Sequence, residues 1–493
     1  MYGEEKSDSL IVAANLANNP QGAESVERRS GAKGNAEQPH MRRTQSRESM
    51  SQRLSRVREA AKQRKKERFT ALFHLLTAEA LENAFLSLSR KAAAGVDGVR
   101  WKDYAENLKV NIADLHRRLH QGSYRAQPGR RHYIPKADGK QRPLGIASLE
   151  DKIVQYALVK ILNAVYENDF MGFSYGFRPG RSQHNALDAL ATGLVRTNVN
   201  WVLDADISQF FDKVSHEWLI RFIEHRIGDQ RVIRLIRKWL TAGTSEEGEW
   251  RASEEGTPQG AVISPLLANI YLHYVFDLWA HQWRRRHATG NVVMVRYADD
   301  IVIGFDKRID AQCFRIAMQR RLKEFGLTVH PKKTRLMEFG RFAAENRASR
   351  GKGKPETFNF LGFTHISGKD RSGRFMLIRK TRRDRMTATL KAIKDGLRKR
   401  WHYSIPEQGK WLRRVVQGYL NYHSVPGNYP MMRKFRIYVT DLWRRALRRR
   451  SQQDDTTWTK ANRLAAVWLP KVRVLHPWPV ERFTARHPRQ EPG

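Results

Sequence analysis

The stretch VVMVRYADDIVIGF, residues 292–305, constrains the fold of this chain more than any other. Two runs of β-branched and apolar residues flank the adjacent carboxylates Asp299 and Asp300. Such runs predict two strands joined by a tight turn, which would place both carboxylates at the tip of a hairpin. Because adjacent negative charges repel each other, their presence together indicates a site that receives cations.

A second acidic stretch, WVLDADI at residues 201–207, predicts another buried strand. Side chains alternate along a strand, so we expect Asp204 and Asp206 to lie on the same face. Carboxylate oxygens are the ligands that Mg²⁺ prefers in proteins. If this strand is a neighbour of the hairpin, the carboxylates predict a site for two Mg²⁺ ions, for which Mn²⁺ is an alternative.

The charge of the chain indicates a polyanionic partner. Lys and Arg number 90 against 50 Asp and Glu, which gives a net charge of +40. The basic residues are spread along the whole sequence, which favours nucleic acid over an acidic membrane surface; a merely basic surface is the alternative.

The single cysteine, Cys313, excludes a disulfide framework and a multi-cysteine zinc module. With no apolar run of membrane-spanning length, we expect a cytoplasmic protein without membrane contact.

Changes in composition divide the sequence into five segments. Residues 1–50 are polar and are predicted to be disordered. Residues 51–200 begin with a basic helix, residues 201–375 contain the acidic strands, and residues 376–455 form Arg-rich helices. Residues 456–493 are a basic C-terminal tail. Strands and helices alternate irregularly, with at least one hairpin, which predicts an α+β fold.

Several motifs resemble a known family. YADD after a β-branched strand, with DADISQFFD upstream, resembles the palm signature of reverse transcriptases. Further stretches resemble, in order, the blocks of the group II intron-encoded subclass, namely AGVDGV, IPKADGKQRPLGI, SYGFRPGRS, GTPQGAVISPLLANIYL, GLTVHPKKT and FNFLGF. GYLNYHSVPGN and its Arg-rich neighbours resemble the thumb, or maturase domain, of the same proteins. The resemblance covers about residues 65–485.

The resemblance implies a right-hand polymerase fold. The fingers would lie within residues 51–200, the palm with its antiparallel sheet would be residues 201–375, and an all-α thumb would follow over residues 376–455. Residues 456–493 would be a possible remnant of a DNA-binding segment. We expect no endonuclease domain of the His/Cys type, because the one cysteine lies far from the thumb.

The resemblance also implies a catalytic site. The residues matching the catalytic and metal-binding positions are Asp206, Asp299 and Asp300, with the backbone carbonyl of Ile207 as a further metal ligand. Asp204 and Asp212 are nearby alternatives. Which of Asp299 and Asp300 would contact both ions is left open by the sequence.

Nucleotide-binding residues follow from the same resemblance. They are Lys136, Lys140, Arg142, Phe211 and Gln259. Lys140 is an alternative to Lys136, because the register of the hairpin around the Asp138-Gly139 turn is open. The ring of Phe211 would lie under the incoming sugar and exclude a 2′-hydroxyl, which favours deoxynucleotides; simple core packing is the alternative.

The remaining implied residues contact nucleic acid. Phe360, Leu361 and Gly362 match the turn that steadies the primer end. Contacts with RNA or template are expected from Arg178, Arg181, Arg413, Arg414, Arg444 and Arg445. The alternatives are a simple loop around Arg178 and a solvated helical bundle around the other arginines.

Together these features predict an RNA-directed DNA polymerase, a nucleotidyltransferase with a two-metal mechanism, that binds its intron RNA, assists splicing and supports mobility by target-primed cDNA synthesis. Its expected partners are group II intron RNA in a ribonucleoprotein, an RNA template with a DNA primer, target DNA and deoxynucleoside triphosphates. Without an endonuclease, mobility would need another source of primer. One alternative is a domesticated reverse transcriptase in a defence, CRISPR-associated or DNA-repair role. Another is an RNA-binding splicing cofactor without polymerase activity, against which the intact carboxylates argue.

Overall fold

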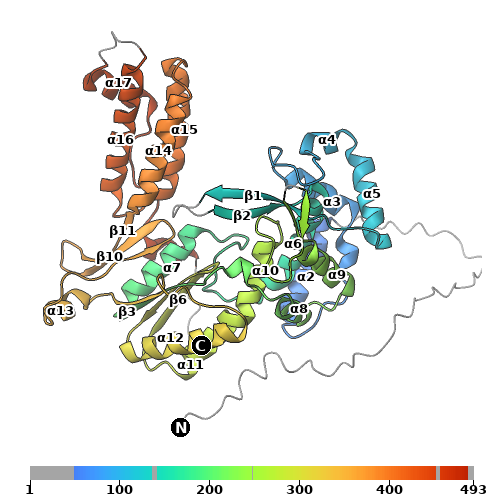
Figure 1. Cartoon of the computed structure of the whole chain (residues 1–493). Coiled ribbons are helices and arrows are strands. Elements are labelled where there is room, and N and C mark those ends of the chain that lie inside the picture. The colour runs from blue at the N-terminus through green and yellow to red at the C-terminus, as the bar shows by residue number, and fades with distance from the viewer. Residues whose placement is uncertain (1–48, 136–140, 247, 451–455, 487–493) are drawn as a thin grey trace, which may run out of the picture. The chain divides into compact units, whose positions relative to one another are not determined.

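The computed structural model describes residues 49–135, 141–246, 248–450 and 456–486 (Figure 1). The chain forms two compact units, each assembled from separated segments. The first unit contains Met1–Met171, Gln209–Leu278 and Phe325–Leu327, and the second contains Gly172–Ser208, Trp279–Glu324 and Thr328–Gly493. Both units combine helices with antiparallel strand pairs, which confirms the predicted α+β class.

Helix α6 (Leu149–Tyr166) is the centre of the first unit. It is apolar on most of its surface and largely buried, as expected of a helix that is covered by others. The Ser148 side chain caps its first turn by accepting a hydrogen bond from the Asp151 amide. Helices α2 (Met50–Gln63), α3 (Ala78–Ser87) and α10 (Ser264–Leu272) pack against it. Other described helices of this unit are α4 (Trp101–Glu106), α5 (Leu108–Gln121), α8 (His216–Glu224) and α9 (Gln230–Thr241).

The first unit also contains a four-stranded sheet with the order β2-β1-β4-β5. Its strands are β1 (Gly129–Pro135), β2 (Gln141–Ile146), β4 (Thr244–Glu246) and β5 (Glu249–Arg251). Strands β1 and β2 pair antiparallel with Pro135 opposite Gln141, so the predicted hairpin is confirmed. The turn residues 136–140 lie outside the described residues, and the predictions for Lys136 and Lys140 fall there.

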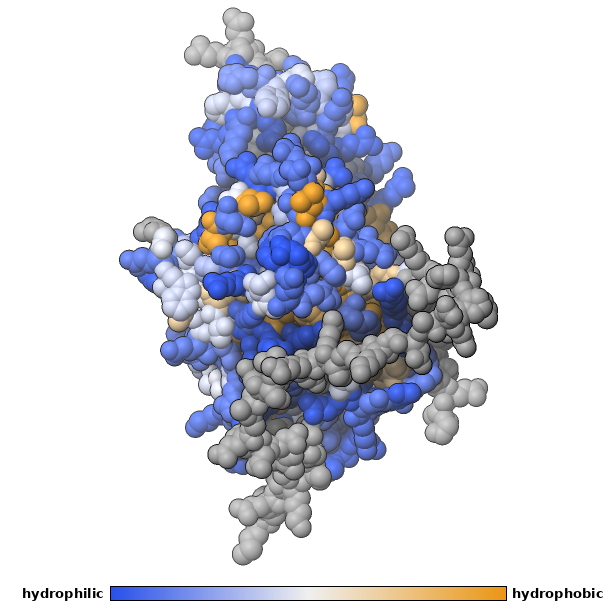
Figure 2. Space-filling model, turned by 90° about the vertical axis from the view of Figure 1, so that its right-hand side faces the viewer, coloured by the Kyte–Doolittle hydropathy of each residue, from blue (hydrophilic) through white to orange (hydrophobic). Residues whose placement is uncertain are grey.

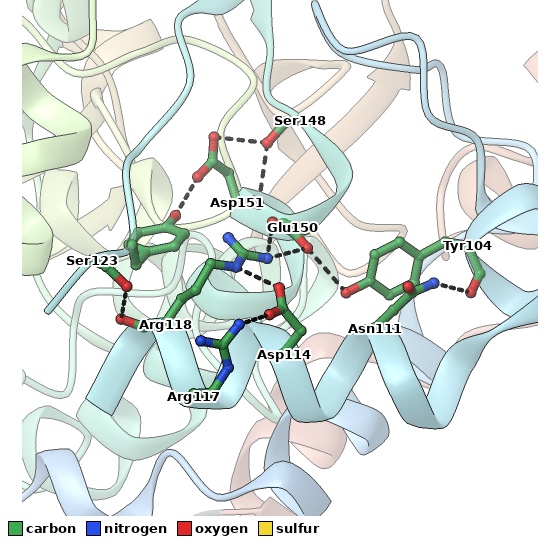
Figure 3. A network of polar contacts seen from close by, with 10 residues as sticks. Tyr104, Asn111, Asp114, Arg117, Arg118, Ser123, Ser148, Glu150 and Asp151 are labelled. Atoms are coloured by element: carbon green, nitrogen blue, oxygen red, sulfur yellow. Dashed lines mark hydrogen bonds and ion pairs between the residues drawn. The ribbon is translucent and has the colours of Figure 1, made fainter. Parts of the chain in front are cut away.

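A polar network ties α5 to α6 and fixes the chain that leads into β1 (Figure 3). Arg118 of α5 contacts Glu150 of α6 at 2.7 Å between Nη2 and Oε1. The Tyr124 hydroxyl donates to the Asp151 carboxylate, and the Gln127 amide donates to the same carboxylate at 3.0 Å. Burial raises the pKa of both Tyr124 and Asp151. The start of the hairpin is therefore anchored to the most buried helix of this unit.

The second unit is built around a sheet with the order β6-β7-β3-β8, in which all neighbours are antiparallel. Its strands are β3 (Trp201–Asp206), β6 (Val292–Tyr297), β7 (Asp300–Phe305) and β8 (Arg335–Glu338). Helix α7 (Gln183–Arg196) packs on the face that carries Val202 and Val302. Helices α12 (Arg308–Glu324) and α11 (Leu278–Arg286) lie on the other side of the sheet (Figure 1), where Phe314 contacts Phe305.

A smaller sheet and a helical bundle complete the second unit. The sheet contains β9 (Phe358–Phe360), β10 (Phe363–Lys369) and β11 (Phe375–Thr381). The C-terminal bundle contains α14 (Arg383–Arg398), α15 (Ile405–His423), α16 (Tyr429–Arg448) and α17 (Trp458–Trp468). Its core includes Leu412, Val416, Phe435, Val439 and Trp443. The remaining helices of this unit are α13 (Ala343–Ala348) and α18 (Pro479–Arg486).

Two details differ from the sequence-based expectation. The segment expected to be helical from residue 376 begins with strand β11, because β11 pairs with β10 over its whole length, and helix α14 starts only at Arg383. Beyond residue 455, α17 packs into the core of the bundle through Ala465. A packed helix therefore stands where a basic C-terminal tail was expected.

The surface is strongly hydrophilic. On the face of the molecule drawn in Figure 2, hydrophilic side chains predominate and hydrophobic ones gather only in small areas. Among the helices that the structure describes, none combines the length and the hydropathy needed to cross a membrane.

Candidate active site

Three carboxylates meet at one end of the β6-β7-β3-β8 sheet. Strand pairing places Asp206, the last residue of β3, opposite Asp300, the first residue of β7. Asp299 precedes Asp300 in the turn that follows Tyr297, so the predicted hairpin with the acidic tip is confirmed. Asp204 is two residues before Asp206 in β3, and both are half-buried between buried neighbours, as expected for one face of a strand.

Hydrogen bonds and close packing fix the turn that carries Asp299. Ala298 has a φ of 56°, a left-handed conformation that is unfavourable for a residue with a Cβ. The fully buried guanidinium of Arg296 donates to the Ala298 carbonyl at 3.1 Å and to the Ser174 hydroxyl at 2.7 Å. Gly176 packs so closely that a Cβ would collide with the Ala298 amide nitrogen. The loop of the SYGF motif therefore fixes the position of Asp299.

The carboxylates strongly affect one another. Desolvation of its carboxyl, followed by the charges of Asp299, Asp206 and Asp204, raises the pKa of Asp300 to about 7. Burial, opposed by Arg335 and assisted by Asp206, raises the pKa of Asp204 to about 6. Negative charge is therefore concentrated here, and a cation would relieve the repulsion.

The donor chemistry of this site suits Mg²⁺. Asp206, Asp299 and Asp300 offer hard carboxylate oxygens, and the Ile207 carbonyl lies next in the chain. In the part of the chain that the structure describes, no three His, Cys, Asp or Glu side chains are already arranged around a common cation position. Asp206 nevertheless accepts a cation here, because Lys333 Nζ lies 2.9 Å from its Oδ2. The residues thus fit divalent ions by their chemistry and charge.

Lys333 was not singled out by sequence reasoning. It belongs to the GLTVHPKKT stretch, where the backbone amide of His330 also donates to the Asp206 carbonyl at 2.7 Å. The available signal was the pair of lysines in that motif, but nothing local indicates that one of them reaches the acidic strand. Lys333 is itself largely exposed.

Two of the predicted nucleotide-binding residues meet in the first unit. Phe211 and Gln259 line one cavity of about 160 Å³. Gln259 Nε2 donates to Asp212 Oδ1 at 2.7 Å, and the Phe211 carbonyl accepts a hydrogen bond from the Thr257 amide at 2.7 Å. Arg131, which sequence reasoning missed, also lines this cavity from strand β1. The only sequence signal for Arg131 was that it lies two residues before Tyr133 in the strand, so the two side chains share one face.

The third described nucleotide-binding candidate, Arg142, is exposed on strand β2 opposite Ile134. It therefore lies on the hairpin, as predicted. A contact of Arg142 with nucleotide stays a prediction, as do the roles of Phe211 and Gln259.

The predicted primer-binding residues form a tight hairpin turn. Phe360 of β9 pairs with Phe363 of β10, so Leu361 and Gly362 are the two turn residues. Their φ values of 45° and 81° are those of a turn with two left-handed residues, which matches the twist of a hairpin. The hydroxyl of Tyr422 donates to the Leu361 carbonyl at 2.8 Å and anchors the turn to helix α15.

Two of the predicted template-binding arginines are engaged within their own loop. Arg178 is buried and donates to the Ser174 carbonyl at 2.8 Å. Arg181 donates to the same carbonyl at 3.0 Å and to the Gly172 carbonyl at 2.5 Å. These contacts support a bracing role, and a template contact stays a prediction.

The bundle arginines differ in their surroundings. Arg413 and Arg414 are exposed side by side on α15. Arg444 and Arg445 of α16 both form ion pairs with Asp441, at 3.0 Å and 2.7 Å. A contact of any of these four arginines with RNA stays a prediction.

Comparison with known proteins identifies the class of this domain. Residues 134–365 match the family described as reverse transcriptase (RNA-dependent DNA polymerase), and this segment contains β3, the acidic hairpin and the Leu361–Gly362 turn. This segment of the chain is therefore similar to reverse transcriptases.

Individual relatives narrow the class further. Over 206 residues the chain is 43% identical to protein YkfC of Escherichia coli K12, covering 41% of this chain and 54% of YkfC. Over 223 residues it is 37% identical to the group II intron-encoded protein LtrA of Lactococcus lactis, covering 45% of this chain and 37% of LtrA. It is also 29% identical over 110 residues to the nuclear intron maturase 2, mitochondrial, of Arabidopsis thaliana, covering 22% of this chain and 15% of that protein.

The resemblance to group II intron-encoded reverse transcriptases is confirmed by these matches. The chain spans about half or less of the length of these curated relatives.

Proposed function

We propose that this protein is an RNA-directed DNA polymerase. The observation that carries the proposal is the register of Asp206 opposite Asp300, beside the turn with Asp299, within a segment that matches reverse transcriptases. Asp206, Asp299, Asp300 and the Ile207 carbonyl would hold two Mg²⁺ ions. The chemistry that bound Mg²⁺ supplies is polarisation of the primer 3′ oxygen and neutralisation of charge on the leaving pyrophosphate.

The surrounding residues position the carboxylates. Arg296 and the loop containing Ser174 and Gly176 hold the turn that presents Asp299. Lys333 neutralises Asp206 through its ion pair. The chain therefore keeps several like charges together by fixing their backbone and supplying one cation of its own.

Selection of the deoxynucleotide would fall to the cavity of Phe211 and Gln259. The ring of Phe211 would exclude a 2′-hydroxyl, and the amide of Gln259 would contact the nucleotide. Arg142 and one of Lys136 and Lys140 would contact its phosphates, as charge-assisted hydrogen bonds to phosphate are among the strong ones.

The segments take the corresponding places in a right-hand polymerase. Residues 51–200 would contain the fingers, 201–375 the palm and 376–455 the thumb or maturase domain, with a possible DNA-binding remnant beyond. Basic surface supports contact with nucleic acid: in the first unit a cavity of about 480 Å³ is lined by Arg90, Lys91, Arg100, Lys102 and Arg130.

A second, related function is intron maturase activity. The printed names of LtrA and of the Arabidopsis maturase support it, and the exposed Arg413 and Arg414 offer an RNA-binding surface. The chain would bind its group II intron RNA, assist splicing in the cytoplasm and support mobility by target-primed cDNA synthesis on target DNA. Splicing of the intron RNA with and without the purified protein tests this part directly.

Primer extension on an RNA template with a DNA primer, deoxynucleotides and Mg²⁺ tests the polymerase. The double substitution Asp299→Ala with Asp300→Ala should lower extension about a thousandfold or more, equivalent to about 4 kcal/mol of transition-state stabilisation. RNA affinity should change little, because the phosphate contacts are made elsewhere.

Asp395→Ala is the matched control, since Asp395 is an exposed carboxylate on α14. It should leave extension intact. Equal activity of the double variant and the control would exclude the carboxylate assignment, and no cDNA from the wild-type protein would exclude the polymerase.

A further inference from the structure

Residues 470–486 run from the end of the bundle back to helix α7, and we call them the C-terminal strap. We infer that the strap positions the primer-binding turn at Leu361 and Gly362, acting through His476 and Arg482. The positioning role rests on the proposed polymerase function, whereas the docking of the strap does not.

The first anchor of the strap is the end of helix α15. The backbone amides of Leu475 and His476 donate to the Ser424 carbonyl at 2.9 Å and 3.3 Å. His476 Nε2 lies 2.7 Å from the Asn421 carbonyl. These bonds hold the strap to the last turn of the helix that also carries Tyr422.

The second anchor is helix α7. Arg482 forms an ion pair with Asp188, whose side chain is only 2% exposed. Two residues further along α18, the Thr484 hydroxyl accepts a hydrogen bond from Arg196 Nη2 at 3.1 Å. Helix α18 therefore contacts α7 near the middle of that helix and at its last residue.

Asp188 joins three segments through its charge. Arg379 of strand β11 is also buried, and its Nη1 lies 3.5 Å from Asp188 Oδ1, so one carboxylate is neutralised by two arginines from different segments. Removing a partner from a buried ion pair is strongly destabilising, because the remaining charge is poorly solvated. When the strap undocks, Asp188 keeps only Arg379 as a cationic partner. This loss of an ion pair makes the undocked state less favourable than the docked one.

A stack of rings connects the two anchors. His184, on the first turn of α7, stacks on His476 with ring centroids 4.0 Å apart. The His184 ring also contacts the ring of Tyr422, with centroids 5.0 Å apart. The strap thus packs His184 against the tyrosine of α15.

Tyr422 completes the path to the turn. Its hydroxyl donates to the Leu361 carbonyl, and its ring lies 3.5 Å from the position that a Cβ on Gly362 would take. The left-handed conformations of Leu361 and Gly362 leave the turn dependent on such outside support. Displacement of the strap therefore removes the stacking partner of His184, weakens the packing of His184 on Tyr422 and so loosens the turn.

Hydrogen exchange of the full-length protein tests docking without any enzymatic readout. Amides of residues 473–484 and of the first turn of α7 should be protected in the wild type and should lose about tenfold or more in protection in Arg482→Ala. Arg473→Ala is the control, because Arg473 is an exposed arginine of the same strap and its loss changes the net charge equally. Arg482→Lys should restore protection in part, since lysine keeps the charge without the planar fork.

Primer extension under steady-state conditions tests positioning. Arg482→Ala should raise the KM for the primer–template about tenfold and shorten the products, while kcat for single-nucleotide addition stays within about twofold. Because Arg482→Ala also lowers stability, His476→Ala provides a second variant. It removes the contact with Asn421 and the contact of 2.8 Å between His476 Nδ1 and Arg482 Nη1, but it keeps both arginine partners of Asp188. It should shift the primer KM in the same direction.

The outcomes distinguish docking of the strap, positioning of the primer-binding turn and the polymerase proposal. Unprotected strap amides in the wild type would overturn docking. Equal primer KM values for Arg482→Ala, His476→Ala and Arg473→Ala, with normal wild-type extension, would overturn the positioning role. No extension by the wild type would contradict the polymerase proposal and the positioning role with it, whereas protected strap amides would still support docking.

Discussion

Among single residues, Phe211 has the surroundings that a sugar-selecting side chain requires. It is half-buried, its carbonyl accepts a hydrogen bond from the Thr257 amide, and the residue lines the same cavity as Gln259. The hydrogen bond fixes the backbone from which the ring projects, and partial burial restricts the side chain. Its ordinary packing and its proposed selectivity are therefore compatible.

Phe211→Ala should admit ribonucleotides. Removing the ring opens space for a 2′-hydroxyl, so discrimination between deoxy- and ribonucleotides should fall on the order of tenfold to a hundredfold. The measurement is kcat/KM for each nucleotide in single-addition assays. Phe211→Tyr is the control and should keep discrimination; unchanged discrimination in Phe211→Ala would show that the ring serves packing alone.

Residues differ in how far the sequence reveals their role. Asp206, Asp299 and Asp300 could be chosen because each stands at the end of a strand pattern, which is local information. Lys333 and Arg296 could not, because their importance depends on contacts with Asp206 and Ala298 that only the fold creates. Arg178 braces its own loop through the Ser174 carbonyl, and its contact with template stays a prediction.

At the level of elements, backbone hydrogen bonds join the SYGF loop to the strand that leads into the acidic turn. The Tyr175 amide donates to the Arg296 carbonyl at 2.8 Å, and the Arg296 amide donates to the Phe173 carbonyl at 2.9 Å. The loop thus adds strand-like pairing to β6 directly before the turn. A change in the loop should be felt at Asp299 without touching any carboxylate.

Gly176→Ala tests this coupling. A Cβ at Gly176 would collide with the Ala298 amide and lie 3.0 Å from the Tyr297 carbonyl carbon, so the backbone must shift. We expect primer extension to fall about a hundredfold and stability to fall by about 1–3 kcal/mol, the usual cost of overpacking. Gly172→Ala is the matched control, because nothing lies within 4 Å of a Cβ there. Equal extension by the two variants would contradict the coupling.

The predictability of the elements follows the range of their interactions. The β1–β2 and β6–β7 hairpins were evident because turn and strand signals are close neighbours in the sequence. The strand character of Arg379 in β11 was hidden by its Arg-rich surroundings and is set by pairing with β10. The strap was missed entirely, because its partners on α7 are distant in sequence.

At the scale of the molecule, buried histidines make the fold sensitive to acid. Burial, together with neighbouring positive groups, lowers the pKa of His365 to about 3, of His184 to about 3 and of His423 to about 4. All three belong to the second unit. Below a pH of about 6.5, the pKa of histidine in the unfolded chain, these histidines bind protons in the unfolded chain but stay neutral in the folded chain. The free energy of unfolding therefore falls as the pH falls.

His365→Phe should reduce this sensitivity. His365 is fully buried and stacks on Phe358 at 4.7 Å, an arrangement that a phenyl ring retains. Each such histidine costs up to about 1.4 kcal/mol per pH unit below its unfolded pKa, so the variant should lose less stability between pH 7 and pH 5. Thermal unfolding at a series of pH values measures the slope, and parallel slopes for variant and wild type would contradict the assignment.

The pairing of Asp188 with Arg482 also has a consequence for biosynthesis. The two residues are 294 positions apart in the chain. At about 5–20 residues per second, a ribosome needs roughly 15–60 s to make the arginine after it has made the aspartate. Throughout that interval the carboxylate of α7 has at most one of its two cationic partners, so the second unit reaches its final packing only after Arg482 has been made.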